Sequence, residues 1–170
     1  MKIRQETPSD YEEVYELLKI SFATTSSDGE WDYLNEVRKK DTFIPELSLV
    51  TEDDKGKIIG QIVLYKMKIN TPEKELTELV LSPISVHPDH FRKGIARAMT
   101  EESFRLAKEL GYKAVFLCGD PIIYRKLGFK PSFEYNIIHI DDNTGKAEWC
   151  MAHELVKGAL KDLAGTINIV

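Results

Sequence analysis

The sequence has little of several features that mark specialised classes of protein. It holds only two cysteines, Cys118 and Cys150, which is too few for a disulfide framework and does not give metal-ligand spacing. We predict that both are reduced residues packed on strands and that no metal is bound. No apolar run approaches the roughly 20 residues that span a bilayer, and the N-terminal residues lack a signal-peptide core. These absences predict a cytoplasmic protein without a membrane partner.

Basic residues are not in excess either. The chain has 23 Lys and Arg against 28 Asp and Glu, a net charge of −5, which argues against a nucleic-acid partner. Its 170 residues are 42% hydrophobic and 30% charged, as in a globular protein of one domain. We therefore predict a single domain over residues 1–170, in which an acidic surface weakly favours a cationic substrate.

Periodicity and turn residues predict an α/β order. A helix with Tyr11, Val14, Tyr15, Leu18 and Phe22 on one face follows the first strand, and a loop over 21–30 leads to a second helix over 31–40. Another helix follows Gly94, with Ile95, Ala98, Met99, Leu106 and Leu110 on one face, and ends at Gly111. Strands are predicted over 1–6, 47–52, 57–69, 75–86, 113–118, 133–140 and 147–154. The last two form a hairpin across 141–146, and the tail 155–170 stays ambiguous, with 166–170 a candidate edge strand.

The most informative stretch is a basic, glycine-containing turn between a strand and a helix. The apolar run from Leu79 to Val86 leads through residues 87–91 into Arg92-Lys93-Gly94-Ile95-Ala96-Arg97. The first N–H groups of a helix lack intrahelical partners, and the helix dipole adds about half a positive charge there. Cations are disfavoured at such a position unless an anion offsets them, so the turn predicts a site for a group such as pyrophosphate.

Two motifs resemble those of the GNAT superfamily of N-acetyltransferases. Gly94 and Ala96 occupy the small-residue positions of its acyl-CoA signature, although Phe91 stands where Gln or Arg is usual. Tyr124-Arg125-Lys126-Leu127-Gly128-Phe129 resembles the family's Tyr-x-x-x-Gly-Phe segment. The resemblance covers nearly the whole chain. It implies an α/β fold in which helices flank a mixed, mostly antiparallel sheet of about seven strands, splayed between the fourth and fifth strands.

The resemblance also implies a cofactor site and a cosubstrate, acetyl-CoA. Pro83 would mark the splay, because a proline cannot donate to a sheet ladder. The amides of Ile84 and Val86 would pair with pantetheine, and the Ile84 N–H would face the developing oxyanion. The implied cofactor-binding residues are Ile84, Ser85, Val86, Arg92, Lys93, Gly94, Ile95, Ala96 and Arg97.

Two further residues take catalytic roles by the same resemblance. Tyr124 would donate a proton to the departing thiolate, or else it packs a helix against the sheet. Glu78 would accept the proton of the attacking amine, as the glutamate at this place does in histone-acetylating members. The alternatives are that ordered water is the base and that Glu78 is a solvated charge at a strand edge.

These inferences predict an N-acetyltransferase that acts by direct attack in a ternary complex. The acceptor is a primary amine on a small molecule or a peptide. Because Phe91 departs from the motif and the base is unproven, the alternative is a non-catalytic acyl-CoA sensor. A nucleotide-binding domain is disfavoured, since neither a P-loop nor G-x-G-x-x-G is present. An exposed terminal strand could pair two copies into a homodimer.

Overall fold

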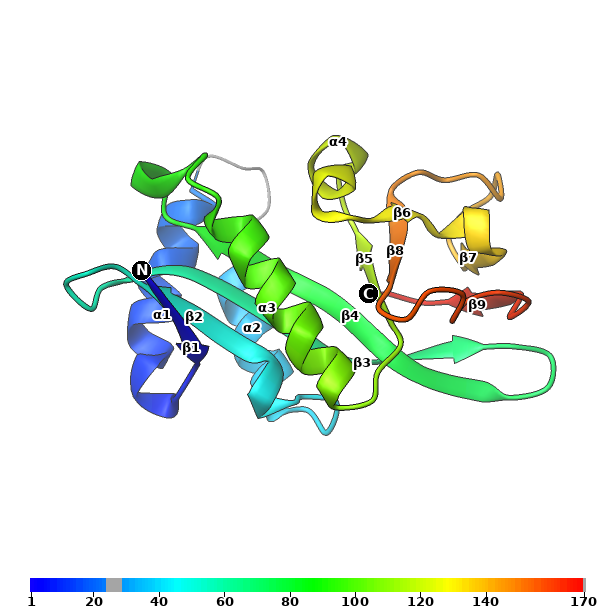
Figure 1. Cartoon of the computed structure of the whole chain (residues 1–170), viewed down its shortest axis with the longest axis horizontal. Coiled ribbons are helices and arrows are strands. Elements are labelled where there is room, and N and C mark those ends of the chain that lie inside the picture. The colour runs from blue at the N-terminus through cyan, green and yellow to red at the C-terminus, as the bar shows by residue number, and fades with distance from the viewer. Residues whose placement is uncertain (24–28, 170) are drawn as a thin grey trace. The chain divides into compact units, whose positions relative to one another are not determined.

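The computed structural model describes residues 1–23 and 29–169, which divide into two compact units. The first holds residues 1–65 and 82–106, and the second holds 66–81 and the remainder from 107. Figure 1 follows the described chain from blue to red. Its helices are α1 (Tyr11–Ser21), α2 (Glu30–Lys39), α3 (Ile95–Glu109) and the short α4 (Pro121–Tyr124). Its strands are β1 (Lys2–Gln5), β2 (Ser48–Glu52), β3 (Ile58–Asn70), β4 (Glu75–Val86), β5 (Ala114–Cys118), β6 (Lys130–Pro131), β7 (Ile137–His139), β8 (Cys150–Glu154) and β9 (Gly165–Ile167).

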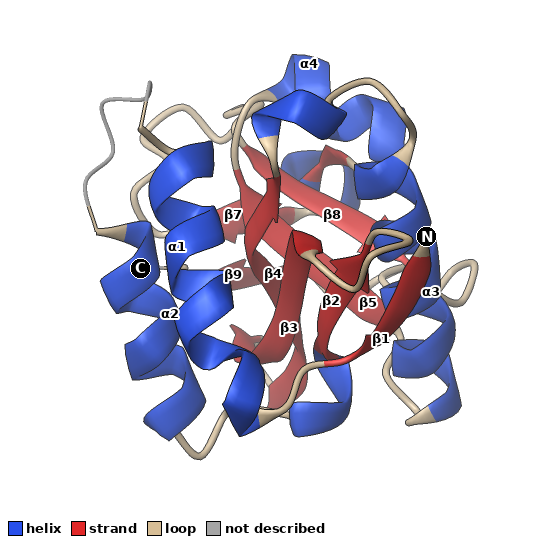
Figure 2. Ribbon diagram, turned by 90° about the vertical axis from the view of Figure 1, so that its left-hand side faces the viewer, coloured by secondary structure: helices blue, strands red, loops and turns tan. Residues whose placement is uncertain are grey.

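The first unit is built on an antiparallel run of strands. β1 pairs with β2 and β2 with β3, and a turn over 53–56 joins β2 to β3 as a hairpin. Helices α1 and α2 lie on one face of these strands and α3 lies on the other (Figure 2). The predicted loop over 21–30 contains residues 24–28, which lie outside the described residues.

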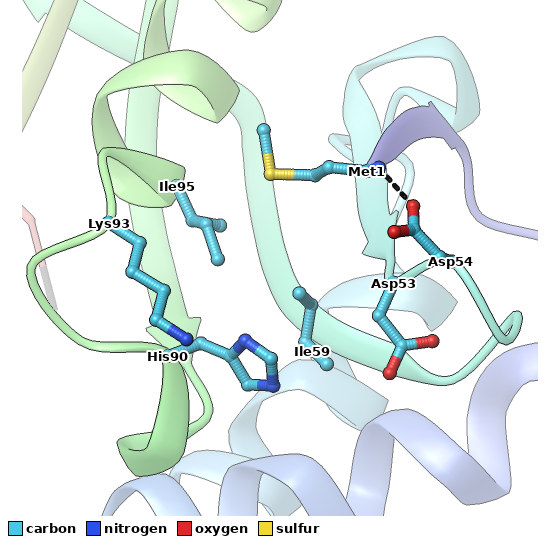
Figure 3. A pocket seen from close by; sticks show the side chains of 7 residues that line it. All are labelled: Met1, Asp53, Asp54, Ile59, His90, Lys93 and Ile95. Carbon is cyan, nitrogen blue, oxygen red and sulfur yellow. Dashed lines mark hydrogen bonds and ion pairs between the residues drawn. The ribbon is translucent and has the colours of Figure 1, made fainter.

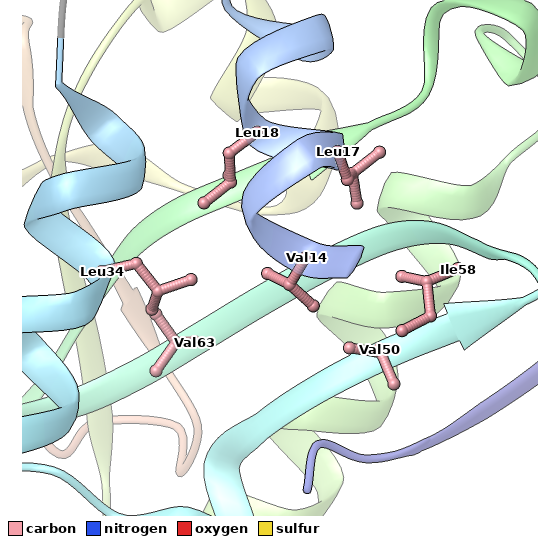
Figure 4. Packing of buried hydrophobic residues seen from close by; sticks show 7 residues of the cluster. All are labelled: Val14, Leu17, Leu18, Leu34, Val50, Ile58 and Val63. Atoms are coloured by element: carbon pink, nitrogen blue, oxygen red, sulfur yellow. The ribbon is translucent and has the colours of Figure 1, made fainter. Parts of the chain in front are cut away.

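Apolar side chains from α1, α2 and the strands form the core on one face of this unit. Val14, Leu17, Leu18, Leu34, Val50, Ile58 and Val63 are all buried there (Figure 4). Tyr11, Tyr15 and Phe22, predicted for the apolar face of α1, are only half-buried. Leu17, which was not predicted, takes a core position instead.

The buried face of helix α3 differs from the one predicted from its leucines. The stripe consists of Ile95, Met99, Ser103 and Ala107, spaced four residues apart. Leu110 lies beyond the helix end and is 49% exposed, so its predicted place on the buried face is wrong. Helix α3 lies close to β3 at this face, because a Cβ added to Gly60 of β3 would lie only 3.1 Å from side-chain atoms of Ile95 and Met99. This close approach suits small residues on the buried face of the helix.

The second unit contains parallel strand pairs within this mostly antiparallel fold. β4 pairs with β5 in parallel at Leu79↔Val115 and Val80↔Phe116. β8 pairs antiparallel with β5 and with β6. β9 pairs with the end of β3 and, in parallel, with β7. The described residues thus form nine strands rather than about seven.

The predicted hairpin between 133–140 and 147–154 is wrong. β7 and β8 have different partners, because a 3-10 turn over Ser132–Tyr135 and the left-handed Asn136 redirect the chain between β6 and β7. The predicted strand near the C-terminus exists as β9, but it lies between β3 and β7 rather than at an edge. Residue 170, at the end of that predicted strand, lies outside the described residues.

Candidate active site

The turn before α3 leads into a helix whose first backbone N–H groups have no intrahelical acceptor. Arg92 and Gly94 both have positive φ, 62° and 80°, which a non-glycine residue such as Arg92 rarely adopts. The Gly94 carbonyl accepts the N–H of Ala98 at 3.0 Å, so the helical bonding starts there. The N–H groups of Ile95 and Ala96 therefore precede any intrahelical acceptor. This is the backbone geometry of an anion site.

Charged side chains surround the same turn. Arg92, Lys93 and Arg97 are all exposed, although a helix N-terminus disfavours cations. Phe91, at the position where the motif usually has a polar residue, is 55% exposed. The turn thus combines free backbone donors and positive charge, and it fits an anionic cofactor.

The end of β4 is oriented by a buried polar link to β3. Ser85 Oγ donates to Gln61 Oε1 at 3.3 Å, and Gln61 Nε2 donates to the Pro83 carbonyl at 3.4 Å. The Ser82-Pro83 peptide bond is cis. The His87 N–H bonds the Ile59 carbonyl of β3, and backbone direction alternates along a strand. The N–H groups of Ile84 and Val86 therefore point to the edge of β4 away from β3. The Ser85 hydroxyl, in contrast, is hydrogen-bonded to Gln61.

A cavity of about 200 Å³ lies beside the turn (Figure 3). His90, Lys93 and Ile95 line it from the turn, and Asp53 and Asp54 line it from the β2–β3 hairpin. The backbone N–H groups of Lys57 and Lys55 lower the pKa of Asp53, so its carboxylate is charged at neutral pH. Two carboxylates would repel pyrophosphate, and we therefore do not assign the cofactor to this cavity.

Tyr124 is held in the second unit by a capped helical turn. The Asp120 carboxylate accepts the Ile122 N–H at 2.9 Å, and Pro121 follows at the first helical position. The Tyr124 ring stands edge-on to Phe129, with centroids 6.1 Å apart. A Cβ on Gly119 would lie 2.4 Å from Tyr124 Cε2. The ring therefore lies directly against the Gly119 backbone, in space that any side chain would fill.

Burial keeps the Tyr124 hydroxyl protonated. Its pKa is raised first by removal from water and then by the negative charge of Asp120. A tyrosine in this state holds a proton throughout the neutral range. It can therefore act as a proton donor.

Glu78 is not a solvated edge charge, which was one alternative. The residue is only 9% exposed, and its Oε1 accepts the Lys113 N–H at 2.9 Å. Burial raises the pKa of the Glu78 carboxyl, while the N–H groups of Lys113 and Ala114 oppose that rise. Glu78 thus joins β4 to the start of β5, and its pKa is displaced toward neutral pH.

The structure distributes the predicted residues between the two units. The first unit holds every predicted cofactor residue, and the second holds Tyr124 and Glu78. Sequence reasoning missed Gln61 and Gly119. The signal for Gln61 was a polar residue inside an apolar strand, and the signal for Gly119 was a glycine just before a helix cap. Residues 1–23 and 29–169 contain no group of three or more His, Cys, Asp or Glu suited to a metal ion.

A family model for the acetyltransferase (GNAT) domain matches residues 2–132. The protein therefore belongs to the GNAT acetyltransferase family, and its fold is the GNAT fold. No curated protein matches the sequence. Within the two described ranges, no helix has the length and apolar character needed to cross a membrane.

Several solved structures are similar to this chain. The GNAT family N-acetyltransferase YhbS from Escherichia coli, in complex with CoA, is 27% identical and covers 99% of this chain and 89% of its own, with a TM-score of 0.85. A GNAT family acetyltransferase from Brucella melitensis, in complex with acetyl-CoA, is 27% identical and covers 76% of this chain and 82% of its own, with a TM-score of 0.66. Chaetomium thermophilum Naa20, in complex with a bisubstrate analogue, is 19% identical and covers 99% of this chain and 97% of its own, with a TM-score of 0.63. At this identity the likeness shows the fold alone.

Proposed function

We propose that the protein transfers an acetyl group from acetyl-CoA to a primary amine of a small molecule or peptide. The amine nitrogen attacks the thioester carbonyl, a tetrahedral intermediate forms, and the C–S bond then breaks to release CoA. The observation that carries the proposal is the turn at Arg92–Gly94, whose left-handed residues present the N-terminal amides of α3 among three cations. The complexes of YhbS with CoA and of the Brucella protein with acetyl-CoA support this choice of cosubstrate.

In the proposed reaction, the end of β4 stabilises charge and Tyr124 supplies a proton. The Ile84 N–H, on the edge of β4 away from β3, donates to the oxyanion of the intermediate. Tyr124 protonates the departing thiolate, a role that its raised pKa supports because the hydroxyl stays protonated at neutral pH.

The amine must lose a proton to attack. A lysine-like amine has a pKa near 10.4, so reaching its neutral form at pH 7 costs about 4.6 kcal/mol. We propose Glu78 as the base, with ordered water as the alternative. Its raised pKa supports this role, because a base works best when its pKa is near the working pH.

The Glu78→Gln substitution distinguishes the two bases. It removes the charge but leaves an oxygen that can accept the Lys113 N–H. If Glu78 is the base, kcat/KM falls about 100-fold or more and loses the dependence on a carboxyl titrating above its ordinary value of 4.5. The measurement is a pH profile of both proteins with the same amine. An unchanged profile assigns the base to water.

The first experiment is a calorimetric titration with acetyl-CoA. We expect micromolar binding by the wild type and loss of at least 100-fold in affinity for Gly94→Glu, which puts bulk and negative charge into the anion turn. Gly158→Glu is the matched control, since Gly158 has a φ of 84° and open space around it, as Gly94 does. Equal binding by wild type and Gly94→Glu, or no binding by the wild type, would contradict the proposed site.

The exposed Phe91 favours a second candidate, a non-catalytic acyl-CoA sensor. This residue replaces a polar side chain of the motif and is 55% exposed. Release of CoA thiol during a screen of polyamines, aminoglycosides, lysine peptides and N-terminal peptides separates the two functions. Turnover with any amine supports the enzyme, whereas tight binding without turnover across the panel supports the sensor.

A further inference from the structure

The two cysteines of the chain are direct partners across one ladder. Cys118 ends β5, Cys150 begins β8, and the register pairs them. The next pair is hydrogen-bonded, since the Gly119 N–H donates to the Trp149 carbonyl at 2.8 Å. Cys118 and Cys150 therefore form a non-hydrogen-bonded pair, in which Cα atoms lie about 4.5 Å apart and side chains share one face. A disulfide needs a Cα separation of about 4.4–6.8 Å.

The two thiols differ in exposure and in acidity. Cys118 is exposed and Cys150 is buried. The Cys118 thiol donates a hydrogen bond to Cys150, and Ser132 Oγ donates to Cys150 Sγ at 3.2 Å. These two donors lower the pKa of Cys150, while the same contact raises the pKa of Cys118 well above its usual range. Cys118 is thus open to solvent, and Cys150 is the buried member of the pair, with the lower pKa.

We propose that Cys118 and Cys150 form a reversible dithiol–disulfide site, oxidised by a small disulfide such as glutathione disulfide. The exposed Cys118 thiol first gives its proton to solvent; its sulfur then attacks one sulfur of the oxidant, which breaks the S–S bond and releases a thiolate that takes up a proton. The Cys150 thiolate then attacks Cys118 Sγ in the mixed disulfide and releases a second thiol. In sum, two protein thiols lose two hydrogens to one disulfide, which becomes two thiols. Both cysteines lie on strands and are free thiols in the structure, as the sequence predicts, and the proposal adds a redox role to them.

The test incubates the full-length protein with glutathione disulfide and then measures its intact mass, its free thiols in denaturant and its non-reducing peptide map. We expect a monomer that has lost two hydrogens and both thiols, with peptides of Cys118 and Cys150 cross-linked. Dithiothreitol restores both thiols. The loop closed by the bond raises the melting temperature by about 5–10 °C.

Three variants make the result specific. Cys118→Ser and Cys150→Ser each leave one thiol and should lose the intramolecular product. Cys118 is exposed, so its variant keeps the test informative even if the buried Cys150 variant fails to fold. Ser132→Ala should retain the product but slow its formation several-fold, with glutathionylated protein accumulating, because the resolving thiolate loses a donor.

A stable mixed disulfide on the wild type, disulfide-linked dimers, or two thiols unchanged at equilibrium would each overturn the proposal. None of these readouts involves acetyl-CoA. Failure of the dithiol site is therefore distinguishable from failure of the proposed acetyltransferase activity.

Discussion

Gly119 determines where the Tyr124 ring can lie. The ring occupies the space of a missing Cβ, at 2.4 Å from Cε2 and 2.9 Å from Cδ2, and real side chains do not approach so closely. Tyr124 is also fixed by the Asp120 cap on one side and by Phe129 on the other. Under the proposed mechanism, the place of the hydroxyl therefore depends on a residue that carries no functional group.

The Gly119→Ala substitution should displace the Tyr124 hydroxyl and lower kcat by about 10–100-fold, because an acid misplaced by an ångström loses most of its effect. Tyr124→Phe should lower kcat by about 100-fold or more with little change in acetyl-CoA affinity. The measurement is steady-state kinetics of both variants, together with a calorimetric titration of each.

The double variant Gly119→Ala/Tyr124→Phe tests whether Gly119 acts through the hydroxyl. In that case the alanine adds little to the loss already caused by phenylalanine, and the single effects are far from additive. Tyr135→Phe, another tyrosine whose pKa is raised by burial, is the matched control and should keep full activity. Additive losses in the double variant would count against a positioning role for Gly119.

Among the elements, β1 and α1 are joined by an ion pair with two parallel hydrogen bonds. Arg4 Nη1 and Nη2 donate to the two oxygens of Asp10 at 2.7 and 2.9 Å, and Arg4 Nε donates to Glu52 of β2 at 2.6 Å. Asp10 also accepts the Thr7 N–H at the start of the helical region. The pKa of Asp10 is lowered from 3.8 to about 2, and the hydrogen bonds from Arg4 are the largest cause.

The Asp10→Asn substitution should therefore lower the free energy of unfolding by about 2 kcal/mol at pH 7. The folded-state pKa of Asp10 lies below its unfolded value, so the stabilisation exists above pH 3.8 and disappears as the pH falls toward about 2. Urea unfolding of wild type and variant across this range gives the two stabilities. They should converge at low pH, while Asp89→Asn, at an 84% exposed carboxylate, should match wild type throughout. A constant difference at every pH would refute the linkage.

The elements near the two motifs could be predicted from sequence because local signals define them. Asp120 with Pro121 gives the start of α4, and farther from the motifs Thr7, Pro8 and Asp10 give the start of a 3-10 turn that leads into α1. The hairpin over 133–154 was mispredicted because local signals do not identify the partners of a strand. Two strands joined by a short polar loop look like a hairpin locally, but β7 pairs with β9, and β8 pairs with β5 and β6.

At the scale of the whole molecule, the fold class was predicted from the order of elements and the two motifs, and the family match together with the solved structures confirms the fold class. The sequence could not give the face of α3, because Ser103 and Ala107 are buried where leucines would be expected. Such a face depends on how close the helix lies to β3, which no local pattern encodes. The burial of Glu78 was equally hidden, since its partner is the backbone of Lys113, 35 residues away.

The contact between Gly60 and the start of α3 has a consequence for binding kinetics. Ile95 and Met99 rest on a strand position without a side chain, so the first turn of α3 is seated on β3 before any ligand arrives. Under the proposed function, an anion that binds at this turn meets a helix already packed on the sheet, so little conformational entropy is lost in placing that helix. The site is then preorganised, and the association rate should be limited by diffusion and charge rather than by a folding step.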